Sequence, residues 1–246
     1  MANSLKKIRE DAKMAFIEFK NVTKQYSTGL HILNALDDAS FKIEEGEFVI
    51  VLGPSGAGKS TLLNLLGGME KATKGEILVD GKDIVKFSDK QLTKYRAEDV
   101  GFVFQFYNLI PTLTALENVE LVNDICDTPV NAKEILEKVG LLESRQQFPS
   151  QLSGGEQQRV SIARAIAKNP KMLLCDEPTG ALDSNTGAQI LTLLQNLSRE
   201  QKKTVIIVTH NASIAQAADK VIHVKNGKIE DIIVNNSPKS ISEVSE

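Results

Sequence analysis

The stretch FVIVLGPSGAGKSTLLNLLGG, residues 48–68, decides the fold because it joins three signals in one run. Residues 48–52 are apolar throughout, which is typical of a strand buried on both faces. Residues 53–60 match the pattern G-x-x-x-x-G-K-[ST], and a helical pattern follows from residue 60. A strand, a glycine-rich loop and a helix in this order are the context in which such a loop binds the phosphates of a nucleotide.

The residue types of this loop predict its chemistry. Backbone N–H groups and the helix N-terminus would hold the β- and γ-phosphates, Lys59 would add a positive charge, and Ser60 would offer an oxygen to Mg²⁺. The alternative is a glycine-rich turn with a solvated lysine, which the flanking strand and helix disfavour. The predicted nucleotide-binding residues of the loop are Gly53, Pro54, Ser55, Gly56, Ala57, Gly58, Lys59, Ser60 and Thr61.

Two further apolar runs lie at residues 172–175 and 205–208, and helical patterns separate the three runs. This alternation predicts an α/β fold with a parallel sheet that is covered on both faces. Polar residues follow each run: the glycine-rich loop follows the first, Asp176 and Glu177 follow the second, and Thr209 and His210 follow the third. Because ligands of open α/β sheets bind at the carboxyl ends of the strands, we expect these side chains to lie near one another.

Accessory elements are expected around this sheet. Residues 16–19 and 39–43 alternate apolar and polar side chains, as half-exposed strands do. Asn226 and Gly227 stand between two alternating runs, which predicts a hairpin that closes the edge of the sheet.

The division of the chain follows from composition and capping signals. Thr114 with Glu117, and Asn131 with Glu134, predict helix starts within a helical insert over about residues 106–168. The ends of the chain are polar, and the last dozen residues are rich in serine. We expect an N-terminal extension at residues 1–13, one domain at residues 14–234 and a flexible tail at residues 235–246.

Composition limits the classes of function. The 246 residues are 41% apolar and carry a net charge of -3, so there is no basic surplus for binding nucleic acid. The longest apolar runs fall far short of the roughly 20 residues that span a bilayer, and the polar N-terminus does not resemble a secretory signal. Cys126 and Cys175 lie far apart, which fits a reducing compartment. We expect a cytosolic protein that binds no nucleic acid.

Asp176 and Glu177 supply the acidic groups that the phosphate loop lacks. A carboxylate at a strand end beside such a loop can hold Mg²⁺, directly or through water, which is the role predicted for Asp176. Successive strand side chains diverge, so Glu177 is free to orient or deprotonate the attacking water. An acidic pair before a proline is by itself more often a strand end or a helix cap. Its position relative to the phosphate loop favours the catalytic interpretation.

The segment LSGGEQQR, residues 152–159, is a second glycine-containing motif. No lysine stands between Gln151 and Ala167, so the motif cannot neutralise a bound anion in the way that the loop at residues 53–60 does. Ser153 can cap the following helix, whose N-terminus would present N–H groups to an anion. The alternative is a Gly-Gly C-cap between two helices.

With these motifs in this order, residues 16–234 resemble the nucleotide-binding subunit of an ABC (ATP-binding cassette) transporter. LSGGEQ is similar to the ABC signature, which very few other phosphate-loop proteins carry. The resemblance implies a P-loop NTPase fold of the RecA type, with a parallel sheet core, an antiparallel β subdomain and a helical signature subdomain. It also implies a homodimer, in which Ser153, Gly154 and Gly155 contact the γ-phosphate of ATP held by the other protomer.

The resemblance assigns roles to further residues. Tyr26 matches the aromatic residue that stacks on adenine, and Gln105 matches the glutamine that senses Mg²⁺ and the attacking water and links to the membrane subunit. Asp183 matches the residue that crosses to the partner protomer, and His210 matches the switch histidine at the γ-phosphate. The structural alternatives are a strand-end tyrosine, a solvated glutamine, a helix N-cap, which is compatible with the other role, and a structural histidine. The resulting catalytic set is Glu177, His210, Gln105 and Lys59, and the metal set is Ser60, Gln105 and Asp176.

Residues 103–121 and 176–184 look like the macrolide-exporter, lipoprotein-release and antimicrobial-peptide-resistance branch of the family. This implies an ATPase that uses ATP and Mg²⁺ and powers a separate membrane permease from the cytoplasmic face of the cell membrane. The permease contact is expected near residues 106–116. The alternative is a cell-division ATPase that regulates cell-wall hydrolases through a membrane partner. A kinase or GTPase would lack the signature. A DNA-repair relative would need a long coiled coil, and the sequence contains no heptad repeats that would form one.

Overall fold

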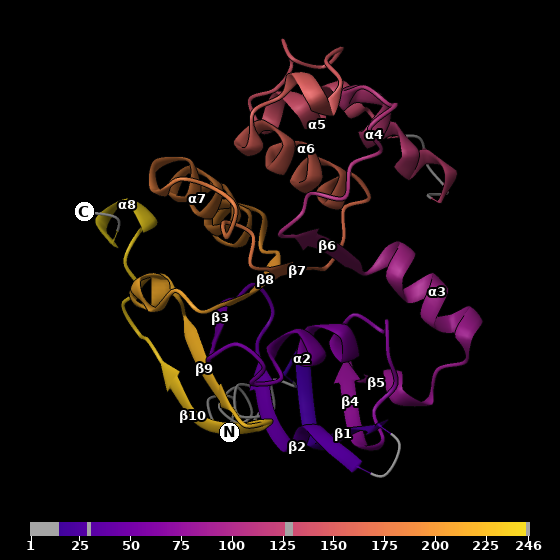
Figure 1. The fold of residues 1–246 in the computed structure, drawn as a ribbon, viewed down its shortest axis with the longest axis vertical. Helices are drawn as coiled ribbons and strands as arrows, with labels where there is room; N and C mark the ends of the chain where they lie inside the picture. Colours follow the sequence, from indigo (N-terminus) through magenta and orange to yellow (C-terminus); the bar gives the residue numbers. More distant parts are fainter. Residues whose placement is uncertain (1–14, 29–30, 126–129, 245–246) are drawn as a thin grey trace, which may run out of the picture.

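The structure is a computed structural model that describes residues 15–28, 31–125 and 130–244. In Figure 1, a central six-stranded sheet has the order β10-β9-β3-β8-β7-β6, and a second, four-stranded sheet has the order β2-β1-β4-β5. The strands are β1 (Ile17–Thr28), β2 (His31–Ile43), β3 (Phe48–Leu52), β4 (Lys74–Val79), β5 (Lys82–Asp83), β6 (Val100–Phe104), β7 (Met172–Asp176), β8 (Thr204–Thr209), β9 (Lys220–Lys225) and β10 (Lys228–Val234).

The central sheet is parallel except at one edge. β3 pairs in parallel with β8 and β9, and β7 pairs in parallel with β6 and β8, whereas β10 runs antiparallel to β9. The turn between β9 and β10 has positive φ at both Asn226 (50°) and Gly227 (77°), as a two-residue hairpin loop of type I′ requires. The α/β fold, its three buried strands and its edge hairpin are therefore confirmed.

β3 shows why its sequence is apolar throughout. Phe48, Ile50 and Leu52 point into one hydrophobic core, and Val49 and Val51 into the other. The first core is covered by α6 and α7, and the second by α2 and the antiparallel sheet. Because side chains alternate along a strand, covering both faces requires an apolar residue at every position.

The helices cover the central sheet and form a separate layer at the top of Figure 1. α4, α5 and α6 make up this layer and lie within residues 106–168, the range expected for the helical insert. Capping boxes open α4 at Thr114 and α6 at Ser153. The α-helices are α2 (Lys59–Leu66), α3 (Asp89–Glu98), α4 (Ala115–Glu120), α5 (Ala132–Lys138), α6 (Gly154–Ala167), α7 (Ser184–Gln201) and α8 (Ile241–Val244), and the 3-10 helices are η1 (Ile84–Lys86), η2 (Leu121–Asp124), η3 (Pro149–Gln151) and η4 (Ala212–Ala217).

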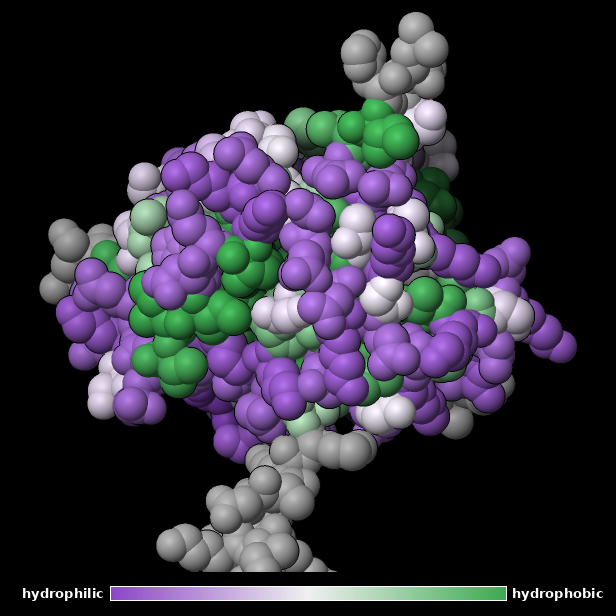
Figure 2. Space-filling model, turned by 90° about the horizontal axis from the view of Figure 1, so that it is seen from below, coloured by the Kyte–Doolittle hydropathy of each residue, from purple (hydrophilic) through white to green (hydrophobic). Residues whose placement is uncertain are grey.

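Apolar side chains also reach the surface in places. Figure 2 shows a mostly hydrophilic face with an apolar gathering at its left, the side on which β10 lies in Figure 1. β10 exposes Ile232, Ile233 and Val234. Over the described ranges, none of the helices combines the length and the apolar character that crossing a bilayer requires.

The C-terminal segment differs from the flexible tail expected from its sequence. Residues 241–244 form α8, and the side chain of Ile241 is fully buried in the core that contains α7. The amide of Gln195 on α7 donates to the carbonyl of Lys239 (3.0 Å) and accepts from the N–H of Ile241 (3.1 Å). One apolar side chain and one side-chain amide therefore order a segment whose composition is polar. The expected extension at residues 1–13, together with Cys126, lies outside the described residues.

Candidate nucleotide-binding site

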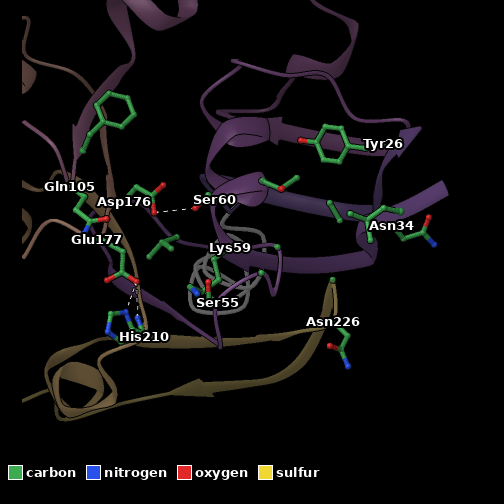
Figure 3. Close-up of a pocket in the computed structure, with 18 of the residues that line it drawn as sticks. Tyr26, Asn34, Ser55, Lys59, Ser60, Gln105, Asp176, Glu177, His210 and Asn226 are labelled. Atoms are coloured by element: carbon green, nitrogen blue, oxygen red, sulfur yellow. Dashed lines mark hydrogen bonds and ion pairs between the residues drawn. The ribbon is translucent and has the colours of Figure 1, made fainter. Parts of the chain in front are cut away.

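An open pocket of about 1150 Å³ lies at the carboxyl ends of the parallel strands, facing the antiparallel sheet. It gathers side chains from β1, from the loop after β3, and from the ends of β6, β7 and β8 (Figure 3). Eleven of the predicted site residues line it: Tyr26, Ser55, Gly56, Gly58, Lys59, Ser60, Thr61, Gln105, Asp176, Glu177 and His210. The structure thus brings together residues that are up to 184 positions apart, from Tyr26 to His210.

The glycine-rich loop is held between two distant parts of the chain. Gly58 has φ +105°, and a Cβ at this position would lie 2.2 Å from the carbonyl oxygen of Ala35 on β2. On the other side, the N–H of Gly227 donates to the carbonyl of Ala57 (2.9 Å). Only glycine meets both the backbone conformation and the close approach at position 58.

The side chain of Lys59 folds back over the loop. Its Nζ donates to the carbonyls of Gly53 (2.8 Å) and Pro54 (2.9 Å), and the residue is only 7% exposed. An anion bound by the loop N–H groups at the start of α2 would meet this ammonium group. Gly53, Pro54 and Ala57 build the loop but do not line the pocket.

The Ser60 hydroxyl and Asp176 form the oxygen-rich part of the pocket. The Ser60 Oγ donates to Asp176 Oδ1 at 3.2 Å. Burial raises the pKa of the half-buried Asp176, and the charge of Glu177 acts in the same direction, against the bond from Ser60. A cation would offset the cost of burying the ionised carboxylate, and hard oxygen donors suit Mg²⁺. Among the described residues, no group of three His, Cys, Asp or Glu side chains could hold a metal ion by itself. A cation here would therefore also need oxygen atoms from a bound phosphate.

Glu177 is held by the end of β8. Its Oε2 accepts from the Thr209 hydroxyl (3.0 Å), and its Oε1 accepts from the backbone N–H of His210 (3.1 Å) and lies 2.8 Å from His210 Nδ1. An ionised carboxylate only accepts, so Nδ1 carries the hydrogen in this contact and Nε2 is the ring nitrogen that can meet a ligand. Glu177 also has φ 47°, a left-handed conformation that is uncommon for a residue with a side chain and recurs at active sites.

Besides Gly53, Pro54 and Ala57 of the loop, four predicted residues do not line this pocket. Ser153, Gly154, Gly155 and Asp183 lie outside its lining, and Ser153 and Asp183 are exposed. Ser153 caps α6 and exchanges hydrogen bonds with Glu156, while Asp183 caps α7 through the N–H of Thr186 (3.0 Å). The two helix starts pack together, since a Cβ on Gly155 would lie 2.2 Å from Thr186 Cγ2.

The pocket also contains residues that the sequence did not single out as site residues. Asn226 and Gly227 were predicted only as a hairpin turn, and that turn lies against the phosphate loop. Motif spacing gives no signal for such a contact, because it joins segments about 170 residues apart. The others are Leu33, Asn34, Ala35, Phe104, Phe106, Asn108 and Val208.

The fold and this pocket define a P-loop nucleotide hydrolase. A family model described as "ABC transporter" matches residues 36–180. The chain belongs to the ABC transporter family, and it is an ATP-binding ATPase of that family, as the sequence predicted.

Similar proteins support the same assignment. An uncharacterised ABC transporter ATP-binding protein of Methanocaldococcus jannaschii, MJ0796, is 48% identical over 87% of this chain and 95% of its own length. The macrolide export ATP-binding/permease protein MacB of Aggregatibacter actinomycetemcomitans is 43% identical over 88% of this chain but only 34% of its own length. A solved dimeric structure of the MJ0796 cassette in a post-hydrolysis state with ADP and Pi has a TM-score of 0.82 at 44% identity, covering 90% of this chain and 99% of that one.

Proposed function

We propose that two copies of this chain bind two ATP molecules between them and hydrolyse them to drive a separate membrane permease. The observation that carries this proposal is the division of the site. The pocket contains Tyr26, the phosphate loop and the acidic pair, whereas Ser153 and Asp183 lie exposed outside it. Exposed helix N-termini that lie outside the pocket suit a γ-phosphate bound by a second copy. The dimeric assembly of the MJ0796 cassette supports the same arrangement.

Each side of the pocket has a role in this proposal. Tyr26 stacks on the adenine, the loop N–H groups and Lys59 bind the phosphates, and Ser60, Asp176 and Gln105 hold Mg²⁺. When bound, Mg²⁺ supplies positive charge that offsets the charge of the phosphates. Oxygen donors from Ser60 and Asp176 fit this ion, and their 3.2 Å contact joins the start of α2 to the end of β7.

Hydrolysis depends on groups fixed by β8. Glu177 orients or deprotonates the attacking water, because its carboxylate is aimed by Thr209 and His210 at the edge of the pocket. His210 is exposed over 72% of its side chain, so in the imidazolium form, where both ring nitrogens are donors, Nε2 can donate to a γ-phosphate while Nδ1 stays on Glu177. Gln105 lies beside Asp176 and Glu177 in Figure 3, where it can respond to the metal and the water.

The permease is proposed to bind near residues 106–116 and to bring the chain to the cytoplasmic face of the membrane. Phe106 is 75% exposed and Ile110 is 41% exposed, and both follow Gln105, so a partner there would contact the segment that ends in the pocket. The likeness to MacB, whose name joins an ATP-binding part to a permease, favours the macrolide-exporter-like branch. The cell-division alternative needs the same cassette, and identifying the co-purified membrane protein decides between the two.

The Glu177→Gln variant tests the hydrolytic role. We expect ATP turnover to fall by at least about 100-fold, because a carboxamide cannot accept the proton of the water. ATP binding should persist, so the variant should elute as a dimer in ATP during size-exclusion chromatography with light scattering. Glu230→Gln is the matched control, since Glu230 is exposed and pairs only with Lys225 among the described residues.

A second substitution in the same background tests the shared site. Ser153→Arg in the Glu177→Gln variant should give a monomer that still binds ATP, because the exposed cap would then carry a bulky side chain at the proposed contact. Normal turnover in Glu177→Gln, or an ATP-stable dimer that persists after Ser153→Arg, would contradict the proposal.

A further inference from the structure

α2 links the two ends of the pocket. It begins at Lys59 in the phosphate loop and ends at Leu66, and the segment after it folds back onto it, with the N–H groups of Met69 (2.9 Å) and Glu70 (3.3 Å) donating to the carbonyl of Asn64. From this position Glu70 accepts a 2.6 Å hydrogen bond from the hydroxyl of Tyr26 on β1. One helix therefore connects the phosphate end and the base end of the pocket.

The Glu70 carboxylate is surrounded by donors. Oε2 receives the Tyr26 hydroxyl and lies 3.0 Å from Lys24 Nζ, and Oε1 receives the Asn64 amide at 3.2 Å. Lys24 Nζ also donates to the carbonyl of Lys71 (3.0 Å) and lies 4.9 Å from the centre of the Tyr26 ring. The side chains of Lys24 and Glu70 are only 15% and 26% exposed, so solvent screens this cluster less than a surface pair.

The protonation states keep this contact intact near neutral pH. Burial raises the pKa of Tyr26, and the bond to Glu70 raises it further, so the phenol remains a donor. Burial also acts to raise the pKa of Glu70, but the hydrogen bonds from Tyr26, Lys24 and Asn64 outweigh it and lower that pKa. The acceptor is therefore a carboxylate.

These contacts leave the Tyr26 ring little freedom. Its backbone is fixed in β1 opposite Leu33 of β2, which lines the same pocket, and its hydroxyl is fixed by Glu70. An aromatic side chain tied at both ends has lost its rotational freedom before a ligand arrives, so stacking on it costs less entropy. Glu70 itself does not line the pocket, so it acts on a ligand only through Tyr26.

We propose that Glu70 is a positioning residue for the nucleobase. It fixes the plane of the Tyr26 ring and ties that ring to α2, so the helix that begins at the phosphate-binding lysine also sets where the base is held. This inference rests on the proposed function, in which Tyr26 stacks on adenine. It assigns a role in nucleotide affinity to a residue outside the pocket.

A double-mutant cycle on the full chain tests the proposal, with calorimetric affinities for ATP and for inorganic triphosphate, which has no base. Glu70→Ala and Tyr26→Phe should each weaken ATP binding by roughly 3- to 10-fold, which is less than the full worth of one hydrogen bond to a charged group, because binding loses only the prior ordering of the ring. Neither should change the affinity for triphosphate. The double variant should bind ATP no more weakly than the weaker single variant, because both changes remove the same bond.

Three further variants keep the outcome interpretable. Glu76→Ala removes an ion-paired glutamate on β4, which pairs with Lys86, and should leave ATP affinity unchanged. Glu70→Gln keeps an acceptor oxygen and should bind ATP more tightly than Glu70→Ala, and it serves if Glu70→Ala does not fold. Tyr26→Ala tests the stacking role itself.

The results separate the two levels of the proposal. If Tyr26→Ala weakens ATP binding but Glu70→Ala does not, the positioning role is wrong and the stacking role stands. If Tyr26→Ala binds ATP normally, the adenine assignment fails. Equal losses for ATP and triphosphate in Glu70→Ala, or losses that add in the double variant, would also overturn the positioning role.

Discussion

At the scale of single residues, the phosphate loop depends on backbone space more than on side chains. Gly58 lies against the carbonyl of Ala35, and a Cβ there would approach its oxygen to 2.2 Å. The carbonyl of Ala35 belongs to the backbone of β2, so it cannot rotate away from a Cβ at position 58 as a flexible side chain would. The end of the pocket where we propose that the base binds depends on a side chain instead, through the bond from Tyr26 to Glu70.

Gly58→Ala should therefore destabilise the protein and disrupt nucleotide binding. The backbone conformation alone costs about 1–2 kcal/mol with a Cβ, and the overlap with Ala35 adds to that cost. Gly140→Ala is the matched control, because Gly140 also has positive φ (71°) but a Cβ there would meet nothing within 4 Å. Urea unfolding should show a clearly larger loss for Gly58→Ala, and equal losses would contradict the steric argument.

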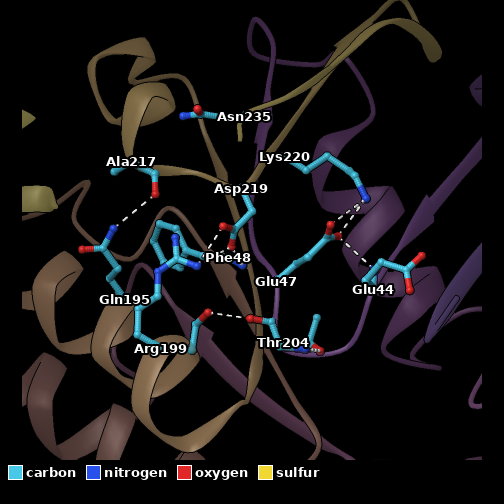
Figure 4. Close-up of polar contacts among 12 residues, drawn as sticks. Glu44, Glu47, Phe48, Gln195, Arg199, Thr204, Ala217, Asp219, Lys220 and Asn235 are labelled. Atoms are coloured by element: carbon cyan, nitrogen blue, oxygen red, sulfur yellow. Dashed lines mark hydrogen bonds and ion pairs between the residues drawn. The ribbon is translucent and has the colours of Figure 1, made fainter. Parts of the chain in front are cut away.

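At the scale of elements, α7 is anchored at the end of the sheet away from the pocket (Figure 4). Arg199 Nη1 donates to both carboxylate oxygens of Asp219 (2.8 Å each), and Asp219 Oδ2 accepts from the N–H of Phe48 at the start of β3 (2.7 Å). Gln195, one helical turn earlier, holds the C-terminal segment and η4 through Lys239 and Ala217. The helix that Asp183 caps is thus fixed at its far end, and α8 completes that anchor.

Ile241→Ala should lower the free energy of unfolding by about 2–4 kcal/mol, because it opens a cavity in the core beneath α8. Ser242→Ala, one residue further along and exposed, should change it by less than about 0.5 kcal/mol. Thermal and urea unfolding of the two variants make the comparison. Equal stabilities would mean that the segment is a flexible tail, as its composition suggested.

At the scale of the whole molecule, the pocket lies where three parts meet. The central sheet supplies the proposed catalytic groups, the antiparallel sheet supplies Tyr26, and the segment after Gln105 leads into the helical layer. A partner bound to that segment would be joined to the pocket by only a few residues. This arrangement supports transmission of motion from the nucleotide to a membrane protein.

Ile110→Glu should weaken the permease contact without loss of soluble ATPase activity, since Ile110 does not line the pocket. Burying an unpaired charge in an interface costs enough to lower affinity by more than about tenfold. Co-purification with the permease and permease-stimulated turnover measure the effect. Ile232→Glu on β10, at the edge of the central sheet, should change neither quantity, and unchanged co-purification of Ile110→Glu would place the contact elsewhere.

Much of the fold could be predicted from sequence because its signals are local. A capping box needs only two residues three positions apart, as at Thr114 and Glu117. A phosphate loop needs an eight-residue motif that follows a strand and precedes a helix. The elements over residues 74–79 and 100–104 escaped prediction, since β4 begins with exposed polar residues and β6 is interrupted by glycine. The order of the strands in each sheet could not be predicted, because it depends on which strands pair with each other, and the periodicity of the sequence carries no information on pairing.

The amino-acid sequence by itself determined the strand-loop-helix unit, the acidic strand end and the second glycine motif, because each depends on neighbours in the chain. Only the tertiary structure decided which of these groups share a pocket, and it left Ser153 and Asp183 outside. It also joined Tyr26 to Glu70, 44 residues away, and packed Ile241 onto α7. Such contacts depend on how sheets and helices stack, since a hydrogen bond or a buried methyl group responds to distance in space and not to separation along the chain.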